Sequence, residues 1–357
     1  MLYLLLLGLV TFIFHRTIRN RIAAAWGPQE QAEEHTAEMP QPAPAGRALR
    51  PRRPPFRTPR RPVAPVAPAE PKYAYETTPK DCAAVKRILA TATNFPPELI
   101  DMVIDFAEYW ACSVASIDFT NSQPSSIIGG SQEENTLMLR TEPLGLGRWH
   151  PEDQGLWRTA APPLKLEMEY SEEEFRRLID GPPSTFEHPF RKIEFDILSR
   201  DQGWGAVDPR DRNTYRHSWT WFDAGIDRFD KSSQDAQDIK QHPTTRAIRP
   251  VWPPLEENER RYNHALHADE AHLIQRNRLT YKEWNHHHIE WSWKDDIAPE
   301  SSASEELKDV GRGTGTGDGS FIRNLKLGDM VTVWGRARFP GWRNNVQSVE
   351  VRVYWAL

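Results

Sequence analysis

A strict two-residue alternation of apolar and polar side chains is the feature that most constrains the fold of this chain. Ile193, Phe195 and Ile197 alternate with Glu194 and Asp196, just before a turn-rich stretch. The same period returns near the C-terminus, in the run V-E-V-R-V-Y-W at residues 349–355. A period of two is typical of a β-strand with one buried and one polar face. We therefore expect strands whose apolar faces are covered by a second layer.

Short runs with a β pattern recur from residue 116 to the C-terminus, separated by long polar loops. Strands do not alternate with long helices here, which argues against a parallel sheet. We predict a mainly-β domain over residues 116–357, an antiparallel β-sandwich of the jelly-roll type. Within it, we expect an inserted helix or loop at about 231–278 and a flexible glycine- and acid-rich loop at about 295–320. Ser171 and Glu174 form a capping box, which predicts a short helix.

The first residues of the chain, 1–14, are apolar without interruption. A helix of that length spans only about 21 Å, short of the ~30 Å hydrocarbon core of a bilayer. No charged side chain precedes the run, whereas Arg16, Arg19 and Arg21 follow it. By the positive-inside rule this pattern leaves the body of the protein facing the cytosol. We predict a short apolar helix that anchors the chain to a membrane. A cleaved signal with a secreted or lumenal product, or a soluble start, are the alternatives.

Residues 15–72 are rich in proline and arginine and poor in large aliphatic side chains. Such a segment cannot bury enough apolar surface to offset the entropy of ordering it, so we predict a disordered linker. Its basic second half could contact anionic lipid head groups or serve as a proline-rich ligand, although a solvated spacer is the simpler interpretation. The formal net charge of −5 for the whole chain gives no reason to expect a nucleic-acid partner.

Residues 73–115 carry apolar side chains at helical spacing. An apolar stripe follows a proline pair and predicts an amphipathic helix, formed by Leu99, Met102, Val103, Phe106 and Trp110. The stretch F-P-P-E-L-I-D-M-V-I-D-F-A, within residues 95–110, resembles the opening of an F-box, the adaptor module of ubiquitin ligases. The resemblance implies contact with a Skp-type adaptor through four residues: Pro97, Leu99, Val103 and Ile104. The alternative is a helix that packs on the domain that follows.

The body of the chain contains the motifs D-Q-G-W-G, S-W-T-W-F-D and F-P-G-W. On these motifs, residues 95–357 resemble a family of uncharacterised fungal proteins. That family has no established activity, so the resemblance implies no chemistry. The order of the expected strands is similar to that of galactose-binding-type sandwiches, in pattern rather than in sequence.

Two loops of the expected sandwich carry residues suited to binding a sugar. Carboxylates and amides hydrogen-bond to paired hydroxyls, while indole rings stack on the apolar face of a pyranose. The alternative is structural, because Asp side chains cap turns and tryptophans fill the space between sheets. The candidate ligand-binding residues are Asp201, Gln202, Trp204, Trp221, Asp223 and Trp342.

The run His286-His287-His288 is a candidate metal site. On a strand, His286 and His288 share one face, and two imidazoles at this spacing can chelate zinc or copper. A third ligand would come from elsewhere, with Glu290, His217 and Asp295 as the options. The alternative is a polar strand face with one imidazole buried.

No sequence pattern identifies a reaction. The chain has no G-x-S-x-G or H-E-x-x-H motif, and Cys82 and Cys112 are too few for a disulfide framework. We therefore expect no cofactor, and a non-catalytic recognition protein whose sandwich binds a glycan or a protein surface while tethered to a membrane. An F-box-like substrate adaptor of a ubiquitin ligase is the first alternative, and a carbohydrate-active enzyme is the second.

Overall fold

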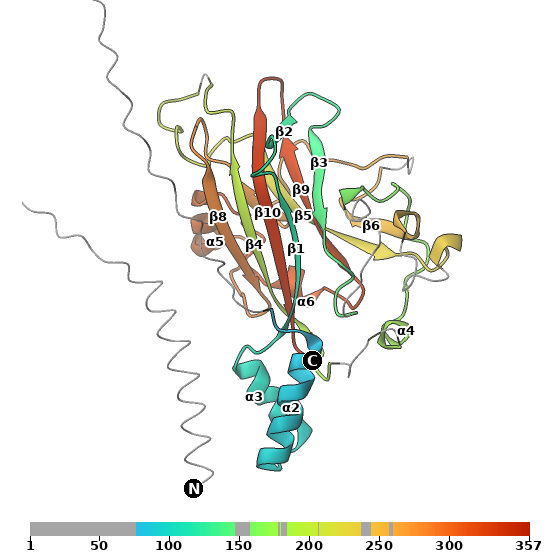
Figure 1. Ribbon diagram of the computed structural model, residues 1–357. Helices are drawn as coiled ribbons and strands as arrows, with labels where there is room; N and C mark the ends of the chain where they lie inside the picture. The colour runs from blue at the N-terminus through green and yellow to red at the C-terminus, as the bar shows by residue number, and fades with distance from the viewer. Residues whose placement is uncertain are drawn as a thin grey trace, which may run out of the picture. The chain divides into compact units, whose positions relative to one another are not determined.

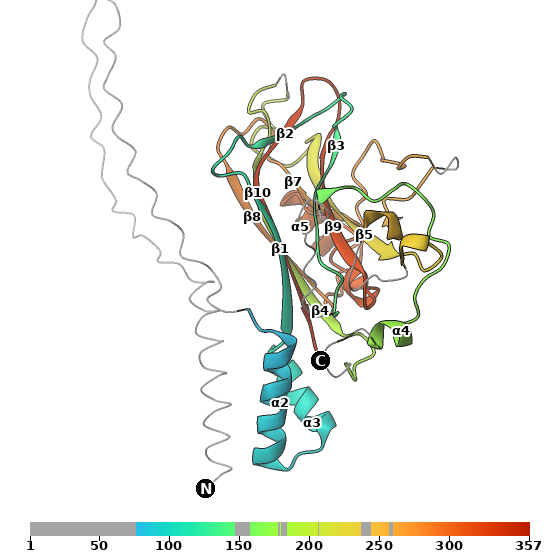
Figure 2. The same cartoon turned by 45° about the vertical axis from the view of Figure 1, so that its right-hand side comes forward.

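Two antiparallel β-sheets lie face to face (Figure 1 and Figure 2). The side chains that the alternation predicts to be buried lie between them. The computed structural model describes residues 76–146, 158–177, 179, 184–205, 207–236, 244–256 and 260–357. All of them belong to one compact unit, Tyr75–Leu357. The prediction of a mainly-β antiparallel sandwich is confirmed.

Sheet A has the strand order β1-β10-β4-β8, and the short strand β2 also pairs with β10. Its strands are β1 (Ala111–Asp118), β2 (Ser125–Ile128), β4 (Phe190–Arg200), β8 (Asn285–Ser292) and β10 (Arg343–Trp355). Sheet B has the order β3-β9-β5-β6, and β7 also pairs with β5. Its strands are β3 (Asn135–Arg140), β5 (Thr220–Phe229), β6 (Ile248–Trp252), β7 (Leu273–Arg276) and β9 (Met330–Ala337).

The central pair of sheet A, β4 and β10, has the alternation that the sequence predicts. Their apolar residues are fully buried and lie opposite one another: Ile193 with Val353, Phe195 with Val351 and Ile197 with Val349. Because side chains alternate across a strand, the intervening polar residues of both strands occupy the other face of the sheet. Sheet A therefore has an apolar inner face and a polar outer face.

A helical hairpin precedes the first strand and consists of α2 (Pro79–Thr93) and α3 (Pro97–Phe106). Thr78 and Asp81 form a capping box at the start of α2, and Asn94 ends the helix in the left-handed conformation. Proline in the first turn starts both helices, where its missing N–H and fixed φ are favourable. The sequence thus specifies both helices and the turn between them.

The hairpin lies at one end of the sandwich (Figure 2), and charged side chains anchor it there. Lys86 Nζ lies 2.6 Å from a carboxylate oxygen of Asp101 and also donates to the carbonyl oxygen of Leu357. Arg191, at the start of β4, donates from Nε to Asp105 at 2.7 Å. The hairpin is therefore attached at the end of the sandwich where β4 begins and the chain ends.

The outer face of sheet B is covered by residues 260–272 rather than open to solvent. The ring of Tyr262 packs edge-on against Trp334 of β9, with 5.5 Å between ring centroids. Arg336 of β9 donates to Asp223 of β5 at 3.0 Å and lies 2.7 Å from Nδ1 of His264. The ring contact of Tyr262 and the contact of Arg336 with His264 thus hold this segment against the sheet.

Several segments differ from the sequence-based expectations. Residues 231–278, expected as an inserted helix or loop, contain the strands β6 and β7 of sheet B, with two short 3-10 turns, η2 (Gln234–Ala236) and η3 (Thr245–Ala247). Residues 295–320, expected as a loop, contain α5 (Ser302–Asp309), capped by Ser301, and lead into α6 (Ser320–Arg323). The helical segment ends before residue 115, because β1 begins at Ala111.

The expected short helix after Ser171 is present as α4 (Glu172–Arg176), with the predicted capping box. The expected anchor at 1–14 and the linker at 15–72 lie outside the described residues. In the part of the chain that the structure describes, no helix is both long enough and apolar enough to cross a bilayer.

The anchoring of the hairpin can be tested with Asp105→Asn. Arg191 is buried and keeps its charge, so the loss of its carboxylate partner should lower the free energy of unfolding by about 3 kcal/mol in urea titrations. The matched control is Asp208→Asn, which removes the partner of the exposed Arg210 and should leave the unfolding midpoint unchanged. Equal effects of the two substitutions would contradict the anchoring role.

Candidate functional site

The loops at the end of the sandwich away from the hairpin contain part of the predicted ligand site (Figure 1). Strand β4 runs from the hairpin end to Arg200, which lies opposite Asn345 near the start of β10. The loop after β4 and the loop before β10 therefore meet at the same rim. We call the side chains they present, Gln202, Trp204, Phe339 and Trp342, the rim surface.

Asp201 holds the first rim loop and is itself buried. One carboxylate oxygen accepts a hydrogen bond from the Gly203 N–H at 2.7 Å, and the other accepts one from the Thr280 N–H. Burial raises the pKa of Asp201 to about 6, although these backbone donors favour the charged form. Gly203 has a φ of +76°, which a residue with a side chain rarely adopts. Asp201 therefore shapes the loop and is not a contact residue.

Trp204 is the most exposed aromatic side chain of the rim surface, at 64%. Gln202 joins the two loops, because its side chain donates to the Trp204 carbonyl at 2.9 Å and accepts from the Arg343 N–H at 3.2 Å. The turn before β10 presents Phe339, which is 41% exposed. Trp342 is half-buried, and its backbone N–H donates to the Phe339 carbonyl at 3.3 Å. An exposed indole beside a tied pair of loops can stack on a flat ligand.

Trp221 and Asp223 do not belong to this surface. They lie on β5, on the covered outer face of sheet B, and are 1% and 3% exposed. Asp223 pairs with Arg336, and the guanidinium of Arg338 lies 5.1 Å from the centre of the Trp221 ring. The sequence-based grouping of these two residues with Trp204 is corrected here, because buried side chains cannot reach a ligand at the rim.

The apolar stripe of α3 faces outward. Leu99 is 44% exposed, Met102 61% and Val103 38%. The buried residues of α3 are Ile100 and Ile104, each 4% exposed, and Asp101, 6% exposed. We call the outward side chains the hairpin face: Leu99, Met102, Val103 and Phe106. The inner side of α3 contacts the domain that follows, as the alternative expects, because Asp105 accepts a hydrogen bond from Arg191 of β4. Trp110, the last residue of the predicted stripe, lies after α3 and is 6% exposed.

Three of the four predicted adaptor contacts are accessible. Pro97, Leu99 and Val103 are exposed, whereas Ile104 is buried within the hairpin and is corrected here to a packing residue. Met102 replaces it on the hairpin face. Helical periodicity could not decide between these two residues, because α3 carries apolar side chains on more than one side.

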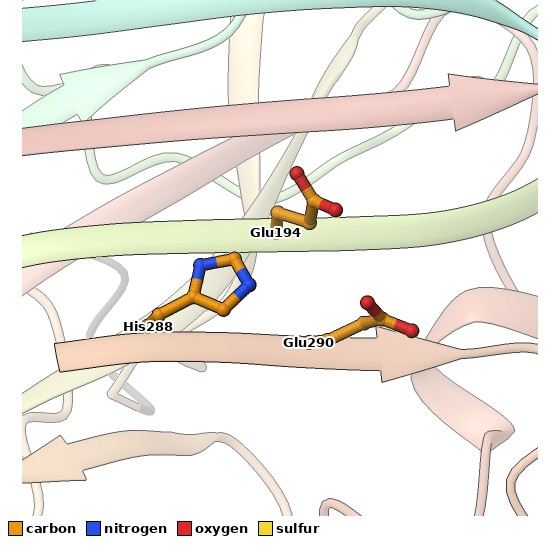
Figure 3. Close-up of side chains that lie close together, drawn as sticks. All are labelled: Glu194, His288 and Glu290. Carbon is orange, nitrogen blue, oxygen red and sulfur yellow. The ribbon is translucent and has the colours of Figure 1, made fainter. Parts of the chain in front are cut away.

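A cluster of polar side chains lies on the outer face of sheet A, where β4 pairs with the edge strand β8 (Figure 3). Glu194 lies opposite Glu290, and His288 lies two residue pairs further along, opposite Asp196. The ligand atoms of these three residues are all within 4.8 Å of one another. Glu194 is 5% exposed, while the side chains of His288 and Glu290 are 36% and 46% exposed. We call these three residues the β4–β8 cluster.

Asp196 and Lys192 flank the β4–β8 cluster. A single oxygen of Asp196 lies 3.0 Å from Nδ1 of His288 and 3.1 Å from Nε2 of His286. Lys192 Nζ lies 2.8 Å from Glu194 and 3.7 Å from Glu290. The Lys192 ammonium therefore contacts the two glutamates of the cluster, while Asp196 contacts its imidazole.

The three consecutive histidines follow the strand alternation. His286 and His288 turn outward, and His287 is buried, where desolvation lowers its pKa to about 4. Of the predicted third ligands, Glu290 joins the cluster. His217 pairs instead with Asp211 at 3.0 Å, and Asp295 accepts from the Ser292 N–H at 2.7 Å. Glu194 was missed, since only the strand register brings it beside residues almost a hundred positions away.

A separate cavity of about 590 Å³ opens beside α4 and residues 323–329, away from every candidate site residue. Its charged side chains pair with one another: Arg228 with Asp329 at 2.7 Å, and Lys326 with Glu169 at 2.9 Å. The charged groups of these two pairs are therefore already neutralised within the cavity.

Comparisons with family models, with curated proteins and with solved structures found no match for this chain.

The raised pKa of Asp201 predicts a pH dependence. The folded state binds a proton more tightly than the unfolded state, so the free energy of unfolding should fall as pH rises from about 4 to about 6 and then level off. Asp201→Asn lacks this titration. The free energy of unfolding of the native protein minus that of the variant, measured in urea titrations, should therefore decrease as pH rises across that window. An increase of this difference with pH would contradict the burial effect.

Proposed function

We propose that the protein is a non-catalytic adaptor, in which the hairpin binds a Skp-type adaptor protein and the sandwich recognises a second ligand. The observation that carries this proposal is the exposed apolar stripe of Leu99, Met102 and Val103 on α3. Burying one such side chain against a partner contributes about 1.5–3 kcal/mol. A stripe at i, i+3 and i+4 is the pattern by which a helix docks into an apolar groove.

The charges around the hairpin face support a protein partner. Asp101 and Asp105 are neutralised by Lys86 and Arg191, so they add no exposed charge to α3. Glu98 remains exposed at the start of the helix. An apolar stripe with an acidic N-terminal edge suits an apolar groove with a basic edge. The F-box-like stretch at residues 95–110 supports the choice of a Skp-type adaptor.

The rim surface is the proposed recognition surface, for a glycan or a protein. It lies at the end of the sandwich opposite the hairpin, so both partners could be held at once. We also propose that the sandwich is of the jelly-roll, galactose-binding type. Exposed Trp204 beside Gln202 supports a sugar ligand, because an indole supplies a stacking face and an amide supplies hydrogen bonds.

The proposal includes a membrane tether through residues 1–14 and a body that faces the cytosol. Its support is the position of the arginines after the apolar run. A Skp-type adaptor is a cytosolic partner, so the proposed orientation and the proposed partner are consistent with each other.

The hairpin proposal is tested by Leu99→Asp combined with Met102→Asp in the full chain. A charge at each position would have to be desolvated in the complex, so capture of a purified Skp-type adaptor should fall at least tenfold. The matched control is Leu266→Asp, because Leu266 is 53% exposed but lies outside the hairpin. Equal capture by the double variant and the control would refute the docking role of α3.

The rim proposal is tested on a glycan array with Trp204→Ala. Loss of one stacking ring should weaken the strongest glycan signal by about tenfold, which corresponds to ~1.4 kcal/mol. Phe106→Ala is the control, since Phe106 is a similarly exposed aromatic residue on the hairpin. A glycan signal that survives Trp204→Ala would exclude the rim surface, and hairpin binding would be unaffected by that result.

A further inference from the structure

We propose that the β4–β8 cluster is a zinc site, with Glu194, His288 and Glu290 as ligands and a fourth position open to solvent. One imidazole nitrogen and two carboxylates form a mixed set that zinc accepts, whereas magnesium and calcium prefer oxygen ligands alone. The ligands come from two adjacent strands whose register sets Glu194 opposite Glu290. This inference does not depend on the adaptor function.

Asp196 orients the histidine for this role. Its carboxylate lies 3.0 Å from Nδ1 of His288, so that nitrogen carries the proton when it donates to Asp196. The ring then presents Nε2, the other nitrogen, on the side of the two glutamates (Figure 3). A carboxylate that holds the far nitrogen of a metal-binding histidine is a recurrent feature of zinc sites.

The local charge favours a divalent cation. The Lys192 ammonium contacts both glutamates, at 2.8 and 3.7 Å, and so brings one positive charge to two carboxylates. A zinc ion supplies two charges at the same place and would displace this ammonium. Lys192 also lies over the ring of Tyr354, 4.6 Å from its centre.

The three ligands can close around an ion without a change in the strands. Zinc bonds of about 2.0–2.1 Å place tetrahedral ligand atoms about 3.3 Å apart, against an upper limit of 4.8 Å in the structure. The side chains of His288 and Glu290 are 36% and 46% exposed, so both have room to rotate. The ion would then join the edge strand β8 to β4.

The test is titration of the full chain with zinc chloride by calorimetry, in excess magnesium, with bound zinc counted after gel filtration. We expect one zinc ion per chain at this site. His288→Ala and Glu290→Gln should each weaken binding at least tenfold, and Asp196→Asn by about 10- to 100-fold. Lys192→Met should tighten binding, because it removes the competing ammonium.

The matched control is His217→Ala. His217 also pairs through Nδ1 with an aspartate at 3.0 Å, but it is not part of the cluster of three ligands. Zinc affinity should be unchanged in this variant. Both His288 and Glu290 are partly exposed, so their variants should fold, and unchanged circular dichroism and melting temperature would verify it.

Any of four results would overturn the proposal. The first three are no zinc retained by the native chain, zinc binding that persists in both His288→Ala and Glu290→Gln, and equal loss of zinc in His217→Ala. Weaker or unchanged binding in Lys192→Met would also overturn it, because the ion would then not lie between the two glutamates. If one cluster variant fails to fold, the other decides the outcome.

Discussion

The antiparallel pairing of β4 with β10 is the constraint on which the rest of the structure depends. These two long strands place Phe190 beside Trp355 at one end of the sandwich and Arg200 opposite Asn345 at the other. A slip of one residue would turn Ile193, Phe195 and Ile197 outward and bring Glu194 into the core. The register therefore fixes the hydrophobic core and the polar outer face together, and it also decides which residues reach each end.

Both proposed binding surfaces are built on the ends of this pair. At one end, Arg191 of β4 holds Asp105 of the hairpin, and the C-terminal carbonyl after β10 accepts from Lys86. At the other, Gln202 after β4 bonds to the backbone of Arg343 at the start of β10. The loops and helices that carry exposed side chains are thus tied to the most rigidly specified strands. Preorganised surfaces of this kind lose little entropy when they bind.

The sequence predicts strands and helices well where one local period dominates. The alternation around Phe195, the amphipathic α3 and the cap at Ser171 are local signals, and all three appear in the structure. Burial of Trp221 and Asp223 is not local, because it depends on residues 260–272 folding over sheet B. Glu194 meets His288 and Glu290 only through the register of β4 with β8. These segments are far apart in the sequence, and local periodicity does not predict which residues of two distant strands pair.

The hairpin shows why periodicity alone could not identify the binding side of a helix. Helix α3 has two sets of apolar residues, and its buried side also contains the acids Asp101 and Asp105. Carboxylates are expensive to bury unless a cation pairs with them, and Lys86 and Arg191 supply that charge from outside the helix. The inner side is therefore held by ion pairs from distant residues, which leaves the apolar stripe outside. Because Ile100 and Ile104 are buried as well, α3 carries apolar side chains on both sides, and this tertiary arrangement is the reason it presents an apolar surface outward.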